Sequence, residues 1–243
     1  MNITKQTALV TGANKGIGFE TARQLAQQGF TVWLGCRHQG RGEAAAKELA
    51  NDGDVRFVSL DVTDAESVRA AAVHVGNETD ALDVLVNNAG VAIGEGEGLP
   101  STVRLETIQH TFDVNFYGAL RVTQAFLPLV QKAQAGRIVN VSSTVGSITT
   151  LVSPGNPLGA FPSFAYPTSK TLLNGLTGWL AIELNDTPIK INSVCPGYNA
   201  TDLNNNLGTL HPSQGAKVVV RAATLPADGP SGSFFDVNGP VGW

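Results

Sequence analysis

The chain has 243 residues, of which 42% are hydrophobic and 15% charged, and its formal net charge is −4. This length suits one large domain and is short for two. The mild acidity argues against a nucleic-acid binder, which needs a basic face, and no apolar run of about 18 residues is available to cross a membrane.

Short apolar runs alternate with stretches of helical period along the chain. We predict strands over 7–12, 31–36, 55–60, 82–88, 136–143, 189–197 and 231–237. Helices are expected over 16–28 and 40–51, after a cap at Thr63 or Asp64, over 104–133 with a kink or an end at Pro128, and from Tyr166 onward. Strands so rich in Val, Ile and Leu are typical of a parallel sheet that is covered on both faces. The sequence therefore predicts an α/β fold, a doubly wound parallel sheet with helices on both faces, as one domain over 1–243.

Three glycines follow the first predicted strand, in "TGANKGIG" at 11–18. Gly12, Gly16 and Gly18 allow a tight turn, let the backbone approach a ligand closely and leave free N–H groups at the start of the next helix. The helix dipole at that point favours a pyrophosphate. The spacing is G-x-x-x-G-x-G rather than G-x-G-x-x-G, so the strand–turn–helix context is needed to indicate dinucleotide binding.

Basic residues end the second predicted strand, where folds that bind NAD usually carry an acid. Arg37, His38 and Arg41 lie in "GCRHQGRG", and no acid precedes Glu43. Guanidinium groups bind a 2′-phosphate bidentately, whereas a carboxylate would repel it. Lys15 in the glycine turn can lean towards the same phosphate. The alternative is a solvated basic loop, and we favour NADP(H) over NAD.

A tyrosine and a lysine, Tyr166 and Lys170, stand four residues apart in "SFAYPTSK" and would share one helix face. A free phenol has a pKa of about 10. A nearby ammonium and an oxidised nicotinamide would lower that value towards neutrality and make the phenol an effective acid and base. The pair alone would be ordinary surface residues. The glycine turn, Ser143 and Asn115 favour a shared site beyond the carboxyl ends of the strands.

Six motifs occur in the order found in the short-chain dehydrogenase/reductase family. They are "TGANKGIG", "NNAG" at 87–90, Asn115 in "DVNFYG", "VSS" at 141–143, Tyr166-x-x-x-Lys170, and "CPGYNATD" at 195–202. The chain resembles this family over nearly its whole length, and "CRHQGRGEAA" and "SFFDVNGPVGW" are similar to its carbonyl reductase branch. The resemblance implies a Rossmann-like domain with a seven-stranded parallel sheet. It also implies reversible, NADPH-dependent reduction of small ketones or aldehydes to alcohols.

The resemblance further assigns roles to single residues. Tyr166 would exchange a proton with the substrate oxygen, and Ser143, rather than Ser142, would hydrogen-bond the same oxygen. Lys170 would hold the nicotinamide ribose and lower the tyrosine pKa, and Asn115 would position a proton-relaying water. The implied cofactor-binding set is Gly12, Asn14, Lys15, Gly16, Ile17, Gly18, Arg37, His38, Arg41, Asp61, Val62, Asn88, Ala89, Gly90, Tyr166, Lys170, Pro196, Gly197, Asn199 and Thr201.

Three loops should form the substrate pocket, namely 91–103, 146–163 and 203–213, the last as a mobile lid. Ser143 and Tyr166 lie 23 residues apart, whereas many family members space them by about a dozen. The extra length falls in 146–163. Because larger insertions at this place interfere with subunit pairing in some carbonyl reductases, a homo-oligomer and a monomer both stay open.

The first residues run directly into a strand without a secretion signal, so we expect a cytoplasmic protein with Cys36 and Cys195 as free thiols. The four histidines and two cysteines show no metal-ligand spacing, and no metal site is predicted. Two rival readings remain. One is a non-enzymatic NADPH-binding regulator, which should have lost one of the four catalytic side chains. The other is a reductase of carrier-bound 3-oxoacyl chains.

Overall fold

Seven parallel strands form the centre of the molecule, in the order β3-β2-β1-β4-β5-β6-β7. The computed structural model describes residues 5–156 and 163–243. The strands are β1 (Thr7–Thr11), β2 (Thr31–Cys36), β3 (Asp54–Ser59), β4 (Val84–Asn87), β5 (Arg137–Val141), β6 (Lys190–Val194) and β7 (Ser233–Phe235). All seven lie where the sequence predicts strands, which confirms the doubly wound parallel sheet. Several predicted ends overrun, because residues such as Ser142 and Pro196 leave the ladder to form loops at the carboxyl edge.

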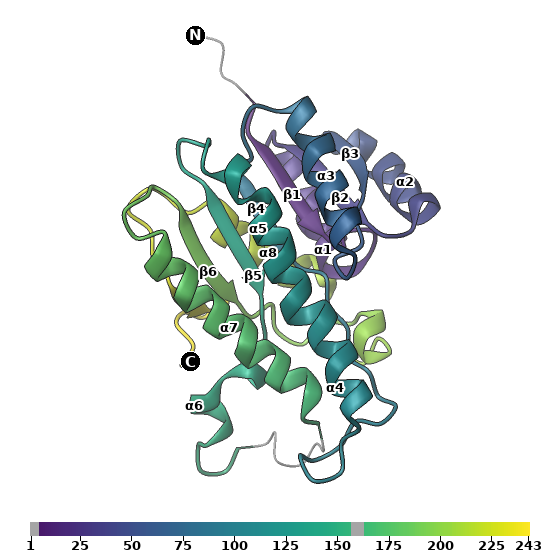
Figure 1. Cartoon of the computed structure of the whole chain (residues 1–243), viewed down its shortest axis with the longest axis vertical. Helices are drawn as coiled ribbons and strands as arrows, with labels where there is room; N and C mark the ends of the chain where they lie inside the picture. The colour runs from purple at the N-terminus through teal and green to yellow at the C-terminus, as the bar shows by residue number, and fades with distance from the viewer. Residues whose placement is uncertain (1–4, 157–162) are drawn as a thin grey trace.

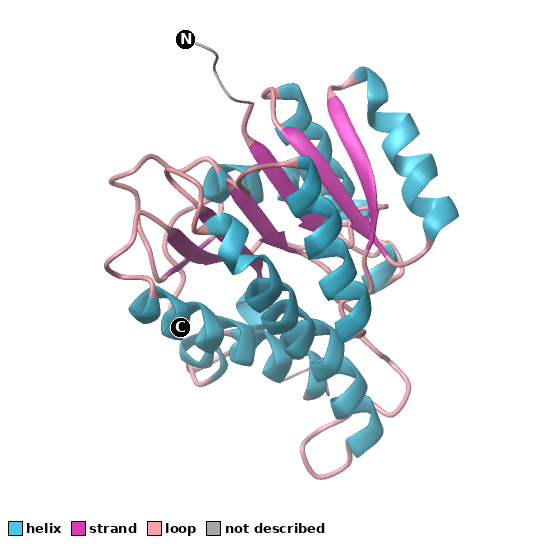
Figure 2. Ribbon diagram, turned by 45° about the horizontal axis from the view of Figure 1, so that its top comes forward, coloured by secondary structure: helices cyan, strands magenta, loops and turns pink. Residues whose placement is uncertain are grey.

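Helices cover both faces of the sheet (Figures 1 and 2). The first three are α1 (Gly16–Gln27), α2 (Gln39–Glu48), which a 3₁₀ turn over Leu49–Asn51 extends, and α3 (Ala65–Glu78). The cap of α3 is Asp64, whose carboxylate accepts a hydrogen bond from the Glu66 N–H at 2.9 Å. The remaining helices are α4 (Leu105–Phe112), α5 (Ala119–Val130), α6 (Ile148–Leu151), α7 (Ala165–Glu183) and α8 (Pro212–Ala223).

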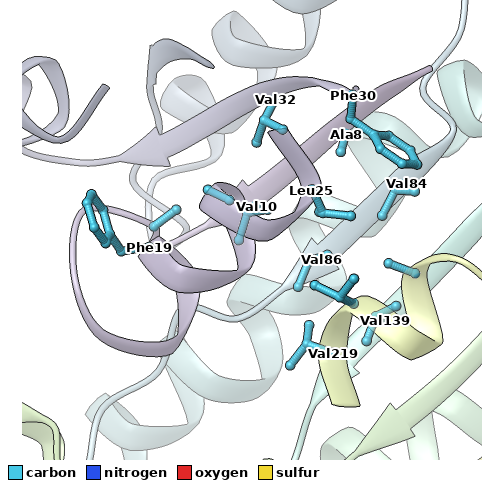
Figure 3. Close-up of a cluster of buried hydrophobic side chains, with 14 of the residues drawn as sticks. Ala8, Val10, Phe19, Leu25, Phe30, Val32, Val84, Val86, Val139 and Val219 are labelled. Atoms are coloured by element: carbon cyan, nitrogen blue, oxygen red, sulfur yellow. The ribbon is translucent and has the colours of Figure 1, made fainter. Parts of the chain in front are cut away.

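Strand pleating divides the core into two apolar layers. Ala8 and Val10 point towards α1 and α8, and Figure 3 shows them with Phe19, Leu25 and Val219. Leu9, between them in sequence, belongs to the opposite layer, which packs against α3, α5 and α7. Leu25 and Phe126 are fully buried, one in each layer, and each such side chain contributes about 1.5–3 kcal/mol by leaving water.

The predicted single helix over 104–133 is interrupted. It consists of α4, a π-helical turn η2 (Asp113–Gly118) and α5. The helix does not end at Pro128 itself but two residues later, at Val130, so that Pro128 lies inside the last turn of α5 and its missing N–H removes a single hydrogen bond. A π turn is common at functional sites, and this one carries Asn115.

No helix is predicted over 212–223, where the structure has α8. Two features of the sequence nevertheless indicate where this helix starts. Pro212 occupies the first helical turn, and His211 and Gln214 form a reciprocal capping box at the helix start. The buried residues Val218, Val219 and Val220 then pack on α1 and the sheet.

Two of the predicted loops contain more structure than expected. Segment 146–163 includes the short helix α6, and residues 157–162 of that prediction lie outside the described residues. Segment 203–213 begins within a 3₁₀ turn (Asp202–Asn204) and ends in the first turn of α8. It is held by the N–H groups of Thr209 and Leu210, which donate to the Tyr198 carbonyl at 2.9 and 3.0 Å. Its predicted motion stays a prediction.

The sheet reverses its winding direction between β1 and β4. Leu9 of β1 pairs with Trp33 of β2 on one side and with Leu85 of β4 on the other. Ligands of doubly wound sheets bind beyond the carboxyl ends of the strands at such a switch point. Within the described residues, no helix has both the length and the apolar character that crossing a membrane requires.

Candidate active site

The glycine turn after β1 is packed so closely that larger residues would collide. Gly12 and Gly16 have φ of +63° and +61°, a conformation that favours glycine. A Cβ atom on Gly18 would lie 2.4 Å from the Asn88 side-chain nitrogen, and one on Gly12 would lie 2.9 Å from the Ala89 Cα. The turn is therefore pressed against the loop after β4.

The start of α1 offers unpaired hydrogen-bond donors. Across 5–156 and 163–243, the N–H groups of Gly16, Ile17 and Gly18 have no acceptor, and the first bond into the helix runs from the Phe19 N–H to the Lys15 carbonyl at 3.3 Å. Lys15 provides no side-chain cap, and no acidic residue lies in the first turn. Three free donors at the positive end of a helix dipole fit an anionic group such as a pyrophosphate.

Asn88 and Ala89 fasten the loop after β4 to this turn. The Asn88 amide donates to the Thr11 carbonyl at 2.8 Å, and the N–H groups of Asn88 and Ala89 both donate to the Thr11 hydroxyl at 3.0 Å. The family resemblance placed the "NNAG" residues beside the cofactor. The structure places Asn88 and Ala89 against the glycine turn and identifies Thr11, which the sequence analysis did not single out, as the residue that joins them.

The predicted cations do not all converge. Lys15 Nζ lies 2.5 Å from a carboxylate oxygen of Asp202, and both side chains are largely exposed. The hydrogen bond and charge of Lys15, with the charge of Arg41, hold the pKa of Asp202 below its usual value. In the chain alone Lys15 therefore pairs with an acid in the loop after β6 and not with the group around Arg37, and its expected contact with a 2′-phosphate stays a prediction. Asp202 was missed because it acts on Lys15 across 187 residues of sequence.

Arg37 and His38 approach a different acid, Asp61, in the loop after β3. Burial acts to raise the pKa of Asp61, but hydrogen bonds from Thr63 and the charges of Arg37 and His38 hold it below its usual value. Val62 is buried beside Asp61. Arg37 and His38 thus lie near Asp61 and Val62, the residues expected to flank the adenine, beyond the carboxyl ends of β2 and β3.

Lys170 is buried beneath the predicted reaction site. It is only 4% exposed, and its ammonium donates to the Val141 carbonyl at 2.9 Å. The same nitrogen lies 5.6 Å from the centre of the Tyr166 ring. Burial lowers the pKa of Lys170 to about 8, against a small opposing effect of Cys195.

The expected lowering of the Tyr166 pKa depends in part on a bound oxidised nicotinamide and stays a prediction, and in the chain alone the pKa moves the other way. Burial raises the pKa of its phenol, Cys195 adds to the rise, and a hydrogen bond with the Ser143 side chain opposes it. In the chain by itself, the loss of hydration outweighs the hydrogen bond with Ser143. The phenol is therefore held in its protonated, proton-donating form.

Of the two serines, Ser143 is the one that meets Tyr166. Ser142 is 2% exposed, and its hydroxyl points to the Lys170 carbonyl at 3.5 Å. Ser143 is half-buried, contacts the Tyr166 phenol and accepts a hydrogen bond from the Val145 N–H at 3.5 Å. This arrangement supports the choice of Ser143 over Ser142.

Asn115, on the π turn, connects this group to the rest of the site. Its side-chain oxygen accepts from the Val91 N–H at 2.8 Å, and its nitrogen donates to the Ser169 hydroxyl at 2.9 Å. Ser169 in turn donates to the Tyr166 carbonyl at 2.7 Å. A Cβ atom on Gly90 would lie 3.4 Å from the Asn115 oxygen and 3.6 Å from Lys170 Nζ. The four predicted catalytic residues, Asn115, Ser143, Tyr166 and Lys170, therefore surround one region. Ser169, which was not predicted as a site residue, joins Asn115 to the backbone of Tyr166.

The loop after β6 closes the far side. Asn199 is 3% exposed, and its side-chain nitrogen donates to the Pro196 and Gly197 carbonyls at 2.9 and 3.0 Å. Thr201 lies near Gly16, where an added Cβ would be 3.4 Å from the Thr201 methyl. Asn199 thus shapes this loop with its side chain, which leaves its backbone N–H for the predicted contact with a carboxamide.

The described residues contain no candidate metal-binding site. No group of three or more His, Cys, Asp or Glu side chains there is close enough to hold an ion. Cys36 and Cys195 are buried free thiols.

Comparisons with known proteins agree with this geometry. A short chain dehydrogenase family model matches residues 6–210. Salutaridine reductase of Papaver bracteatum is 35% identical, with 97% of this chain and 96% of the relative covered. Carbonyl reductase (NADPH) 1 of Mus musculus is 34% identical, with 96% and 97% covered. The structure of an NADPH-bound carbonyl reductase from chicken fatty liver superposes with a TM-score of 0.86 at 28% identity, covering 99% of this chain and 100% of that one. This chain therefore belongs to the short-chain dehydrogenase/reductase family, as an oxidoreductase of its carbonyl reductase-like branch.

Proposed function

We propose that the protein is an NADP(H)-dependent carbonyl reductase that converts ketones or aldehydes to alcohols and runs in reverse as an alcohol dehydrogenase. One observation carries the proposal. The Tyr166 phenol lies beside the Ser143 side chain, with the Lys170 ammonium 5.6 Å from the centre of its ring, beyond the sheet edge that also holds the free donors of the glycine turn.

The roles of the side chains follow from their chemistry. NADPH, when bound, would supply the hydride to the carbonyl carbon, and the chain supplies placement and the proton. Tyr166 donates its phenolic proton to the carbonyl oxygen, and the Ser143 hydroxyl hydrogen-bonds the same oxygen as negative charge develops on it. In the reverse direction the phenolate accepts the proton from the alcohol.

Lys170 and Asn115 make that proton transfer favourable. The Lys170 ammonium stabilises the phenolate left after proton donation, and it would also hydrogen-bond the ribose hydroxyls of the cofactor. The positive charge of an oxidised nicotinamide acts in the same direction, against the effect of burial on Tyr166. Asn115 holds the loop after β4 by both of its side-chain atoms, and its proposed water relay to Lys170 remains part of the hypothesis.

The choice of NADP(H) rests on charge. Arg37 and His38 follow β2 with no acid at the strand end, and guanidinium groups bind a phosphate bidentately. The glycine turn fits the pyrophosphate through the N–H groups of Gly16, Ile17 and Gly18. Two of the reductase relatives carry NADPH in their names or descriptions, which supports the same cofactor here.

The test is a panel of small ketones and aldehydes, followed by the absorbance of NADPH and, separately, NADH. The proposal expects turnover of several substrates with a preference for NADPH, and analysis of the alcohol gives the stereochemistry. A protein that binds NADPH but reduces no member of the panel, including a 3-oxoacyl thioester, would support the non-enzymatic alternative.

A further inference from the structure

The helix that carries Tyr166 begins without a cap from its own sequence. The first residue before α7, Phe164, makes no side-chain capping bond. Pro167 has no N–H, and the first helical bond runs from the Thr168 N–H to the Phe164 carbonyl at 3.1 Å. The N–H groups of Phe164, Ala165 and Tyr166 therefore need acceptors from elsewhere.

The two oxygens of one carboxylate accept hydrogen bonds from all three N–H groups. Glu97, in the loop before α4, accepts from the Phe164 N–H at 2.8 Å and from the Ala165 N–H at 3.1 Å through Oε1. Its Oε2 accepts from the Tyr166 N–H at 3.4 Å. These contacts span 67 to 69 residues of sequence. No sequence pattern for a helix cap could reveal them, because known caps are local.

The loop holds Glu97 ready for this contact. The Arg104 N–H, at the start of α4, donates to the Gly96 carbonyl at 2.9 Å, and the Thr107 hydroxyl on α4 donates to the Glu95 carbonyl at 2.9 Å. Figure 1 shows the loop before α4 and the start of α7 at the same lower end of the molecule. Glu97 thus links a predicted substrate loop, which α4 holds in place, directly to α7, the helix of the proposed proton donor.

The carboxylate carries a negative charge at the positive end of the α7 dipole. Burial acts to raise the pKa of Glu97, but the N–H groups of Phe164, Ala165, Gly98 and Tyr166 hold it below its usual value. The side chain is therefore ionised at neutral pH, the form that best stabilises a helix N-terminus.

We propose that Glu97 is a positioning residue for the reaction: it caps α7 from outside the helix and fixes Tyr166 for proton transfer. The inference rests on the proposed function of Tyr166. The first helical turn is where fraying occurs, and Tyr166 lies in that turn. Lys170 lies one turn deeper and is anchored separately to the Val141 carbonyl. Loss of Glu97 should therefore displace Tyr166 and spare Lys170.

Amide hydrogen exchange on the cofactor-free protein tests the cap without any assay of activity. In Glu97→Ala, exchange of the N–H groups of Phe164, Ala165 and Tyr166 should accelerate about tenfold, while the rest of α7 stays protected. Glu97→Gln should give a smaller change, because an amide oxygen still accepts. The matched control is Glu95→Gln, in the same loop, whose side chain is 88% exposed and should leave α7 unchanged. Equal exchange in Glu97→Ala and the native protein would overturn the cap.

Steady-state kinetics and NADPH titration test the positioning role. Glu97→Ala should lower kcat by about 10- to 100-fold, since a displacement of about 1 Å is enough for such a loss, while the Kd for NADPH changes less than about twofold. Glu97→Gln should recover part of the loss, and Glu95→Gln should match the native protein. Faster exchange with unchanged kcat, or an equal loss of kcat and NADPH affinity, would overturn the positioning role. If the native protein itself shows no turnover, the proposed function fails, and hydrogen exchange alone decides whether Glu97 caps α7.

Discussion

Two groups of polar side chains lie beyond the carboxyl edge of the sheet, and they differ in how the protein holds them. Ser143, after β5, and Tyr166 and Lys170, on α7, are buried or half-buried, and burial shifts the pKa values of Tyr166 and Lys170. Lys15, Arg37 and His38 on loops and Arg41 in the first turn of α2 are all exposed, so that water and salt screen their charges. The buried group should therefore govern the chemical step, and the exposed group should govern the choice of cofactor.

The largest expected effect separates the two groups most clearly. Tyr166→Phe removes the proton donor and keeps the ring, so kcat should fall by about 10³-fold or more, while the Kd for NADPH stays within about twofold. The measurement is NADPH oxidation with the best ketone of the panel, together with fluorescence titration of NADPH.

Tyr117→Phe is the matched control, because this tyrosine is 48% exposed on η2 and should tolerate the same change. Full activity in Tyr166→Phe would contradict its role as the proton donor. A parallel loss of NADPH affinity would show instead that the two groups are not separable.

The exposed group should respond in the opposite way. Arg37→Asp places a carboxylate where the 2′-phosphate is proposed to bind, so the ratio of kcat/KM for NADPH over NADH should fall by about 100-fold, with kcat for NADH little changed. Arg69→Asp makes the same charge change on exposed α3 and serves as the control. An unchanged ratio would remove Arg37 from cofactor selection.

The pKa of Lys170 predicts a pH effect that only the buried group should show. The kcat/KM for NADPH reports on the free enzyme, so it should decline above pH 8, about tenfold per unit, as the ammonium of Lys170 loses its proton. Tyr166 does not interfere, because burial raises the pKa of its phenol. A flat profile up to pH 10 would contradict an essential Lys170 ammonium.

Over the same pH window, the contribution of Lys170 to the free energy of unfolding should rise, whereas activity falls. Between the folded pKa of about 8 and the ordinary value of 10.5, the unfolded chain binds a proton that the folded chain releases. The contribution of Lys170 to the free energy of unfolding therefore increases as pH rises through this window. Because activity falls while this contribution grows, denaturant unfolding at pH 7.5 and pH 9 distinguishes titration of Lys170 from unfolding.

Local patterns predicted the sheet and much of the site. Seven short apolar runs and the glycine turn define the strands and the crevice, because strand burial and φ-positive turns depend on residues close in sequence. The spacing of Tyr166 and Lys170 correctly placed both on α7, since four residues make one helical turn.

The features that were missed depend on contacts between distant segments. The cap of α7 by Glu97 and the pair of Lys15 with Asp202 join residues far apart in the chain. The sequence also does not show how deeply Tyr166 is buried, and in the chain alone this burial raises the pKa of the phenol. The lowered pKa expected with a bound oxidised nicotinamide stays a prediction. Helix α8 was missed because its polar start resembles the preceding turns.

The smallest expected effect concerns the pair that joins the two sides of the crevice. Asp202 holds Lys15 in an exposed contact at 2.5 Å, and a 2′-phosphate would have to compete with that carboxylate for the ammonium. Asp202→Asn should therefore tighten NADPH binding by about two- to fivefold at low ionic strength and leave NADH binding unchanged, because exposed ion pairs are weak. The gain should shrink as salt is added. Asp228→Asn, an equal charge change in the exposed turn after α8, controls for net charge. Weaker NADPH binding in Asp202→Asn would mean that Asp202 holds Lys15 in place for the phosphate, and the exposed group would then depend on fixed geometry as the buried group does.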